Sequence, residues 1–181
     1  MGRQEEGLTR RGSSGTGIPP ADMVALMVRM LHEAFEGPPG PWSYFTDLTP
    51  GTGVFATIAG LHAAEVSQGG GPGGSTIAGH VQHLSATLTR STNALHGETT
   101  AHDRSRTWTV SVVDEQAWVH LRAGLRRAYD TFCVAVETQA TWDEEPLGVV
   151  FGAIAHAAYH LGAIRQRVPR PGPAQTHPSP P

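Results

Sequence analysis

The sequence predicts an all-α protein, most simply a four-helix bundle, and three observations lead to that prediction. Apolar residues recur at spacings of three and four along four long segments, which is the periodicity of amphipathic helices. Capping residues, glycines and prolines stand at the ends of these segments. No alternating strand pattern of useful length occurs, apart from a weak one at 107–113. With 181 residues, the chain is long enough to bury the core of one domain.

The long helices are expected at 21–36, 76–97, 114–138 and 144–167. Gly37 is placed to end the first helix, and Thr76 or Ser75 has the hydroxyl that an N-cap needs. Asp114 stands where the third helix begins, and an acidic turn opens the fourth, where negative charge matches the helix dipole. A shorter helix is expected around 54–67, between the first two long ones.

The chain divides into a central bundle domain, 20–167, and two ends of different composition. Residues 1–19 are polar and residues 168–181 are rich in proline, so we expect both ends to be disordered. Inside the domain, the 16 residues 96–111 separate the second and third helices. That connection is long for a tight hairpin and long enough to cross the length of a ~30 Å bundle.

Composition argues against several classes of function. The formal net charge of −3 does not fit an ordinary nucleic-acid-binding protein, which needs a positive patch. All 13 basic residues are arginine, so a Schiff-base lysine, a phosphate-loop lysine and a Ser–Lys dyad are excluded. Cys133 is the only cysteine, which excludes an intramolecular disulfide and a cysteine-based metal cluster.

The sequence also carries expectations about location and assembly. No apolar signal segment opens the chain, so a cytoplasmic protein is expected. Residues 147–164 are uncharged over 18 positions, but three glycines, two histidines and five alanines argue against a membrane span. This segment has no polar face, and its small residues allow close helix approach, so we expect it to support a homodimer.

The strongest chemical signal is a pair of histidines in the fourth predicted helix. His156 and His160 are four residues apart, so their side chains stack on one helix face about 6 Å apart. Because the helix is apolar on all sides, both imidazoles are buried and their nitrogens need partners. Either each histidine hydrogen-bonds a neighbouring group, or the two share a metal ion. Ala157 follows His156, so the motif is not the His-Glu-x-x-His of zinc proteases.

A second pair, His80 and His83, lies in the second predicted helix. A stripe through Ile77, Leu84 and Leu95 marks the buried face of that helix. On a helical wheel His80 lies roughly 60° from the centre of this stripe and His83 roughly 120°, so periodicity alone makes His80 the more inward of the two. Histidine pairs on two buried helices are the arrangement from which metal sites in bundles are built.

These motifs carry a family resemblance. The segment TIAGHVQHL at 76–84, the tryptophan Trp108 and the segment HAAYHLGAIRQ at 156–166 together resemble the DinB/YfiT-like superfamily. The resemblance covers about residues 20–167, which is nearly all of the expected bundle. It implies an up-down-down-up four-helix bundle with a long crossover between the second and third helices.

The resemblance further implies a divalent metal ion held by three histidines, one from the second helix and two from the fourth. Matched position by position, the ligands are His83, His156 and His160. His80 has no counterpart in the minimal motif, and we keep it as a second candidate ligand or as a partner of a ligand. Neutral nitrogen ligands suit Zn²⁺ and Ni²⁺, with Fe²⁺ as a further candidate.

Three histidine ligands leave coordination positions open, which is typical of catalytic sites. The resemblance implies a metal-dependent hydrolase or a low-molecular-weight-thiol S-transferase, acting on a small molecule and, for the transferase, using a thiol cosubstrate. The alternatives are a non-catalytic metal-binding stress or interaction protein that acts as a dimer, and a bundle without metal. An acid near the site would favour the enzyme, and Asp103, Asp114 and Glu65 are candidates. Arg165 either pairs with an acidic substrate group or interacts with the helix C-terminus.

Overall fold

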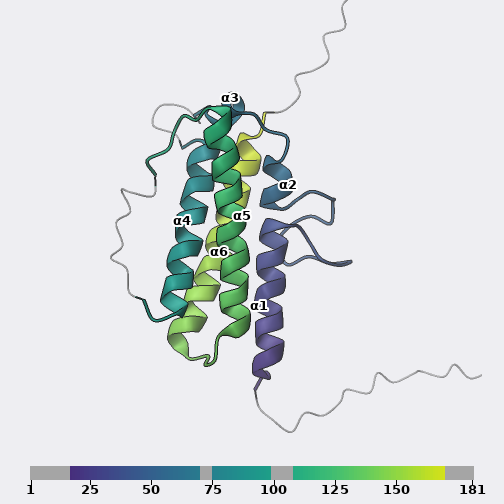
Figure 1. Cartoon of the computed structure of the whole chain (residues 1–181). Coiled ribbons are helices and arrows are strands. Elements are labelled where there is room, and N and C mark those ends of the chain that lie inside the picture. The colour runs from purple at the N-terminus through teal and green to yellow at the C-terminus, as the bar shows by residue number, and fades with distance from the viewer. Residues whose placement is uncertain (1–16, 70–74, 99–107, 170–181) are drawn as a thin grey trace, which may run out of the picture.

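The computed structural model describes residues 17–69, 75–98 and 108–169. In this part of the chain the protein is all-α, with four long and two short helices packed together (Figure 1). The helices are α1 (Pro20–Phe35), α2 (Val54–Ile58), α3 (Ala63–Val66), α4 (Ile77–Leu95), α5 (Glu115–Thr138) and α6 (Glu144–Arg167). The predicted disordered ends lie almost wholly outside the described residues.

The four long helices are confirmed, with each end within two residues of its predicted position. The single short helix expected around 54–67 is wrong, because the structure has two shorter helices there, α2 and α3. Gly60 lies in the turn between them, and the Glu65 side chain accepts a hydrogen bond from the backbone N–H of His62, 2.8 Å away, which starts α3 as a separate helix.

The predicted capping residues lie where the helices begin and end. The Thr76 side chain accepts a hydrogen bond from the Gly79 backbone N–H at 3.0 Å, and Asp114 accepts one from Ala117 at 2.7 Å. Gly37, just beyond α1, has a φ of +105°, a conformation that residues with a side chain rarely adopt. Substituting caps of this kind with alanine typically costs about 1 kcal/mol each, so they help to set the helix boundaries.

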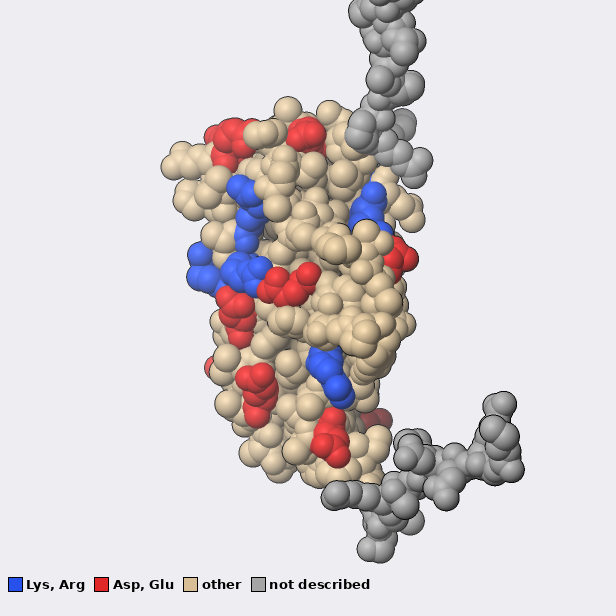
Figure 2. Space-filling model, turned by 90° about the vertical axis from the view of Figure 1, so that its right-hand side faces the viewer, with Lys and Arg blue, Asp and Glu red and all other residues tan. Residues whose placement is uncertain are grey.

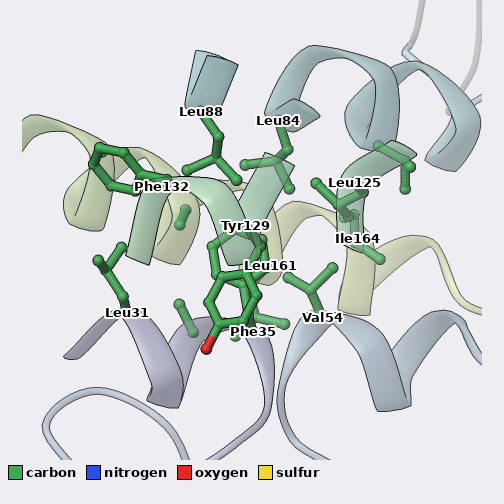
Figure 3. Close-up of a cluster of buried hydrophobic side chains, with 14 of the residues drawn as sticks. Leu31, Phe35, Val54, Leu84, Leu88, Leu125, Tyr129, Phe132, Leu161 and Ile164 are labelled. Carbon is green, nitrogen blue, oxygen red and sulfur yellow. The ribbon is translucent and has the colours of Figure 1, made fainter. Parts of the chain in front are cut away.

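The hydrophobic core lies where the four long helices meet (Figure 3). Every long helix contributes side chains that are almost completely buried, and α2 adds Val54 and Ile58. The largest of these are Trp118, Phe35, Phe132, Met27, Leu31, Ile58, Ile77, Leu84, Leu88, Leu125 and Ile164. Since burying one such side chain contributes roughly 1.5–3 kcal/mol, packing between helices, and not helix propensity, holds α4 and α6 in place.

Contacts between residues give the relative directions of neighbouring helices. On α5, a Cβ at Gly124 would lie 3.9 Å from Ser85 Oγ of α4, and further along both helices Thr92 and Thr131 line one shared hollow. Figure 1 shows that α4 and α5 run in the same direction, and the neighbouring residues named above agree with it. Between α4 and α6 the order is reversed, because the start of α4 contacts the second half of α6.

A buried carboxylate, which the sequence did not predict, holds the loop after α1. Glu33 is fully buried and accepts hydrogen bonds from the backbone N–H groups of Tyr44, Phe45 and Thr46 at 2.7 to 2.8 Å. The Thr46 hydroxyl donates a fourth bond, at 2.9 Å. Burial alone would raise the pKa of Glu33, but these four donors outweigh it and lower the pKa. The carboxylate therefore folds residues 44–46 back onto α1 and has a structural role.

The outer side of α6 is unusually apolar. By length and composition alone α6 could cross a membrane, but a buried core helix passes the same test, and 39% of its apolar window is buried inside the protein. On its outer side Phe151 is 47% exposed and Tyr159 is 69% exposed.

Charged side chains of both signs are interspersed over the face drawn in Figure 2, with wide uncharged areas between them.

Candidate metal centre

The packing of α4 against α6 brings together the three histidines that the resemblance selects. One ring nitrogen from each of His83, His156 and His160 lies within 4.8 Å of the corresponding nitrogens of the other two. The ring centroids of His156 and His160 are 4.4 Å apart, and His83 lies 4.9 and 5.0 Å from them. Two helices of opposite direction thus supply one cluster, in which a single ion would have three nitrogen ligands.

The cluster is buried, and burial keeps His156 and His160 uncharged around pH 7. His160 and His83 are almost completely buried, and His156 is half-buried. Burial, followed by the neighbouring histidines, lowers the pKa of His160 to about 3. Burial, followed by the charge of Arg90, also lowers the pKa of His156. Neutral imidazoles keep the lone pairs that metal ligation requires.

His156 is the residue that best distinguishes the two interpretations of the pair. Its Nε2 atom is buried and has no hydrogen-bond partner among the described residues. Leaving a buried polar atom unsatisfied costs about 1–3 kcal/mol, so a histidine kept only for structure would be expected to have a partner there. A metal ion at the centre of the cluster would satisfy this nitrogen. The residues present therefore fit a metal ion.

The three ring nitrogens lie close enough together for small side-chain rotations to bring them around one ion. Nitrogens bound at ~2.1 Å in tetrahedral geometry lie about 3.4 Å apart, less than the 4.8 Å limit found for the three rings. Rotations of the imidazoles that move their nitrogens by about an ångström bridge this difference, which is within ordinary side-chain freedom.

His80 lies beside the cluster as a partner of one of its histidines. Its Nδ1 atom is 2.7 Å from Nδ1 of His160, and its Nε2 atom is 2.9 Å from Ser75 Oγ. Arg167, at the end of α6, donates to Ser75 Oγ at 3.2 Å and to the Ser75 carbonyl at 3.0 Å. Burial, followed by Arg167 and His83, lowers the pKa of His80 to about 4. His80 is thus neutral and fully hydrogen-bonded.

These hydrogen bonds determine which nitrogen of His160 can face an ion. A bond between two Nδ1 atoms contains one proton, so one ring donates and the other accepts. If the Nδ1–H of His160 donates to His80, the Nε2 lone pair of His160 is available for a metal. The Nε2–H of His80 then donates to Ser75 Oγ, which also accepts from Arg167. In this arrangement His160, His80, Ser75 and Arg167 each have a donor or acceptor role that matches the next residue in the hydrogen-bonded series.

The helical wheel failed to separate His80 from His83 because α4 is covered on two sides. The segment 108–113 packs against α4, where a Cβ at Gly79 would lie only 3.0 Å from the Val110 carbonyl oxygen. Trp108 stacks on His83, with ring centroids 4.5 Å apart and planes at 19°, and meets His80 edge-on at 5.2 Å. Both histidines are therefore buried, although His83 lies far from the apolar stripe.

The acidic residues that were candidates for a catalytic role are used elsewhere or are not described. Asp114 caps α5 and Glu65 caps α3, and neither belongs to the histidine cluster. Asp103 lies outside the described residues. Arg165 pairs with Asp47 at 2.9 Å on the surface, so it has an internal partner and does not simply interact with the helix end.

Comparisons with protein-family models, with curated proteins and with solved structures found no match. The resemblance to the DinB/YfiT-like superfamily therefore depends on the sequence motifs together with the all-helical fold and the buried three-histidine cluster.

Proposed function

We propose that this protein binds one divalent metal ion through His83, His156 and His160. The observation that carries the proposal is the convergence of three buried imidazoles from two helices, with the buried Nε2 of His156 unpartnered among the described residues. Their nitrogen chemistry favours Zn²⁺ or Ni²⁺, with Fe²⁺ as a further candidate.

We also propose that the chain is a DinB/YfiT-like up-down-down-up bundle. The common direction of α4 and α5 supports this topology, because a simple up-and-down bundle would make consecutive long helices antiparallel. The reversed direction of α6 relative to α4 supports it as well, since that arrangement places His83 opposite His156.

For activity we propose a hydrolase or a low-molecular-weight-thiol S-transferase acting on a small molecule. When bound, an ion with open positions would lower the pKa of a coordinated water or thiol. The chain itself supplies no reactive thiolate, because burial raises the pKa of Cys133, the only cysteine, to about 11. A thiol reaction would therefore depend on a cosubstrate.

A second candidate function is a non-catalytic metal-binding protein that acts as a dimer. Phe151 and Tyr159 are exposed on the apolar outer side of α6, and an exposed apolar surface of this kind favours association with a second copy of the chain. Purified protein is stripped of metal and reloaded with Zn²⁺ or Ni²⁺, and elemental analysis should then find one ion per chain. Light scattering on the same sample measures the oligomeric state. A screen of esters, amides and thiol cosubstrates measures turnover. Turnover supports the enzyme, and a dimer without turnover supports the alternative. Metal content well below one per chain with every ion would contradict both.

We expect His80→Leu to weaken Zn²⁺ binding about 10–100-fold, as removal of a hydrogen-bond partner of a metal ligand typically does. His80→Asn should stay within about threefold of wild type, because an amide oxygen can accept the His160 proton at the position of Nδ1. Competition with a chromophoric chelator measures both affinities, and His96→Asn is a surface control. If His80→Leu eliminates stoichiometric binding while His83→Ala preserves it, then His80 is the ligand on α4.

A further inference from the structure

A groove of about 620 Å³ runs between α4 and α6 and reaches the histidine cluster at one end. His156 and Thr87 lie at that end, whereas Glu98 and Glu145 lie at the other. The helix α6 rises by about 16 Å between Glu145 and His156, which is enough for an extended small molecule. The wall on the α6 side contains small residues such as Gly152, which leave room for the chain of a ligand.

The groove is the side from which a ligand can reach the cluster. His156, whose buried Nε2 has no hydrogen-bond partner among the described residues, is the cluster member that lines it. A second cavity of about 440 Å³ touches the cluster at His160 and His80. There the two Nδ1 atoms bond each other, and Trp108 stacks over His83. Open coordination positions are therefore expected to face the groove.

A buried hydroxyl lacks a partner at the cluster end of the groove. Thr87 is 5% exposed, and its Oγ1 atom has no hydrogen-bond partner in the described part of the chain. The neighbouring threonines on α4 differ, because Thr89 and Thr92 each donate to the carbonyl four residues earlier, at 3.0 Å. Leaving a buried hydroxyl unpaired is costly, so Thr87 points to a polar group that enters from the groove.

The far end of the groove is acidic. Glu98 and Glu145 are both exposed there, and neither carboxylate has an ion-pair partner among the described residues. Arg90, the one cation among the described residues that line the groove, already has an interaction of its own. One positive and two negative side chains give this lining a net charge of −1, and its unpaired charges are negative.

The helix dipoles do not change the sign of this charge. Helix α4 ends and α6 begins at the acidic end, so a partial negative charge and a partial positive charge lie side by side and offset each other. Asp143 and Glu144, directly before Glu145 in the chain, add further negative charge nearby. The far end of the groove therefore attracts a cation and disfavours an anion.

We propose that the groove between α4 and α6 is the substrate site and that it binds a ligand with an aliphatic ammonium group at its far end. In this pose the head of the ligand faces the three histidines and hydrogen-bonds the Thr87 hydroxyl, while its ammonium group lies beside the carboxylates of Glu98 and Glu145. This inference rests on the proposed metal site and adds the class of substrate, a compound with a primary amine.

Three probes added to the Co²⁺ protein test the class of ligand. The monohydroxamates of ω-aminooctanoic, ω-hydroxyoctanoic and octanedioic acid share the metal-binding head and the chain length, and they end in an ammonium, a hydroxyl and a carboxylate. The visible absorption of Co²⁺ reports the binding of each. We expect the ammonium probe to bind about 3–10-fold more tightly than the hydroxyl probe, as one or two exposed ion pairs would give, and the carboxylate probe to bind most weakly. The preference should shrink at about 1 M salt, where exposed charges are screened.

Charge-neutral variants show which residues cause the preference. The double variant Glu98→Gln with Glu145→Gln should remove it and leave the affinity for the hydroxyl probe unchanged. Glu137→Gln, on the exposed surface of α5 and outside the groove lining, is the matched control and should leave the preference at its wild-type value. A wild type without the preference, or a preference that persists in the double variant, would overturn the amine class.

Two further variants test the groove itself. Gly152→Leu should block all three probes, and it should fold because a Cβ at Gly152 meets nothing within 4 Å. Thr87→Val should weaken all three probes alike, about 3–10-fold, because they share the head, while Co²⁺ affinity stays the same. Co²⁺ binding with probe affinities unaffected by Gly152→Leu would overturn the groove proposal and leave the metal site standing. Failure of the wild type to bind Co²⁺ would overturn both.

Discussion

We expect His156→Ala to abolish stoichiometric Zn²⁺ binding and to leave the metal-free protein at least as stable as wild type. Affinity should fall by more than about 10³-fold, because two imidazoles hold an ion far more weakly than three. The metal-free protein should gain up to about 1–2 kcal/mol, since the variant removes a buried nitrogen that has no hydrogen-bond partner among the described residues. Chelator competition measures the first effect, and urea unfolding in the presence of EDTA measures the second.

The sign of the stability change separates a ligand from a structural histidine. A histidine that is kept for its own hydrogen bonds would lower the free energy of unfolding when replaced, with no change in metal binding. His120→Ala, on the exposed side of α5, is the matched control and should leave both quantities at their wild-type values. A loss of stability in His156→Ala together with unchanged Zn²⁺ binding would mean that the pair on α6 is structural.

The metal-free protein should lose stability steeply as the pH falls from 7 to 5. In the unfolded chain each histidine titrates near 6.5, whereas in the folded protein the pKa of His80 is about 4 and that of His160 about 3. The unfolded state therefore binds more protons in this interval, so the free energy of unfolding rises with pH and falls on acidification. Each histidine that stays neutral contributes about 1.4 kcal/mol per pH unit within the window, giving roughly 2–4 kcal/mol between pH 7 and 5.

Urea unfolding at a series of pH values, with EDTA present, tests this expectation. The positive charges of Arg167, which acts on His80, and of Arg90, which acts on His156, lower the pKa of these histidines in the same direction as burial. His160→Leu should have a smaller dependence of stability on pH, because one neutral histidine is gone. A free energy of unfolding that is constant between pH 7 and 5 would show that these imidazoles take up protons in the folded protein as they do in the unfolded chain.

The parts of the fold that follow from local sequence could be predicted. Apolar periodicity located the four long helices, and Thr76, Asp114 and Gly37 located helix ends, because a cap depends only on its own turn. The two short helices, α2 and α3, were harder to predict. A four- or five-residue helix has almost no periodic pattern, and the break between α2 and α3 depends on the side chain of Glu65.

The candidate site depends on contacts between distant segments, which a local sequence pattern does not predict. His156 and His160 could be paired from their spacing, but bringing His83 to them requires the packing of α4 on α6. The bond between His80 and His160 joins residues 80 positions apart. Glu33 is similar, because nothing beside it in the sequence shows that three loop N–H groups will meet its carboxylate.

The pairing of α1 with α6 and α5 has a consequence for folding kinetics. His32 of α1 bonds Tyr129 of α5 across 97 positions, and Asp47, in the loop after α1, pairs with Arg165 of α6 across 118. Helical proteins usually fold within microseconds to milliseconds because most of their contacts are local. Here the first long helix acquires its partners only after more than half of the chain has closed a loop, and the entropy of that closure opposes the folding transition state. The protein should therefore fold more slowly than its helix content suggests, with α1 exposed to solvent until α5 and α6 have been synthesised.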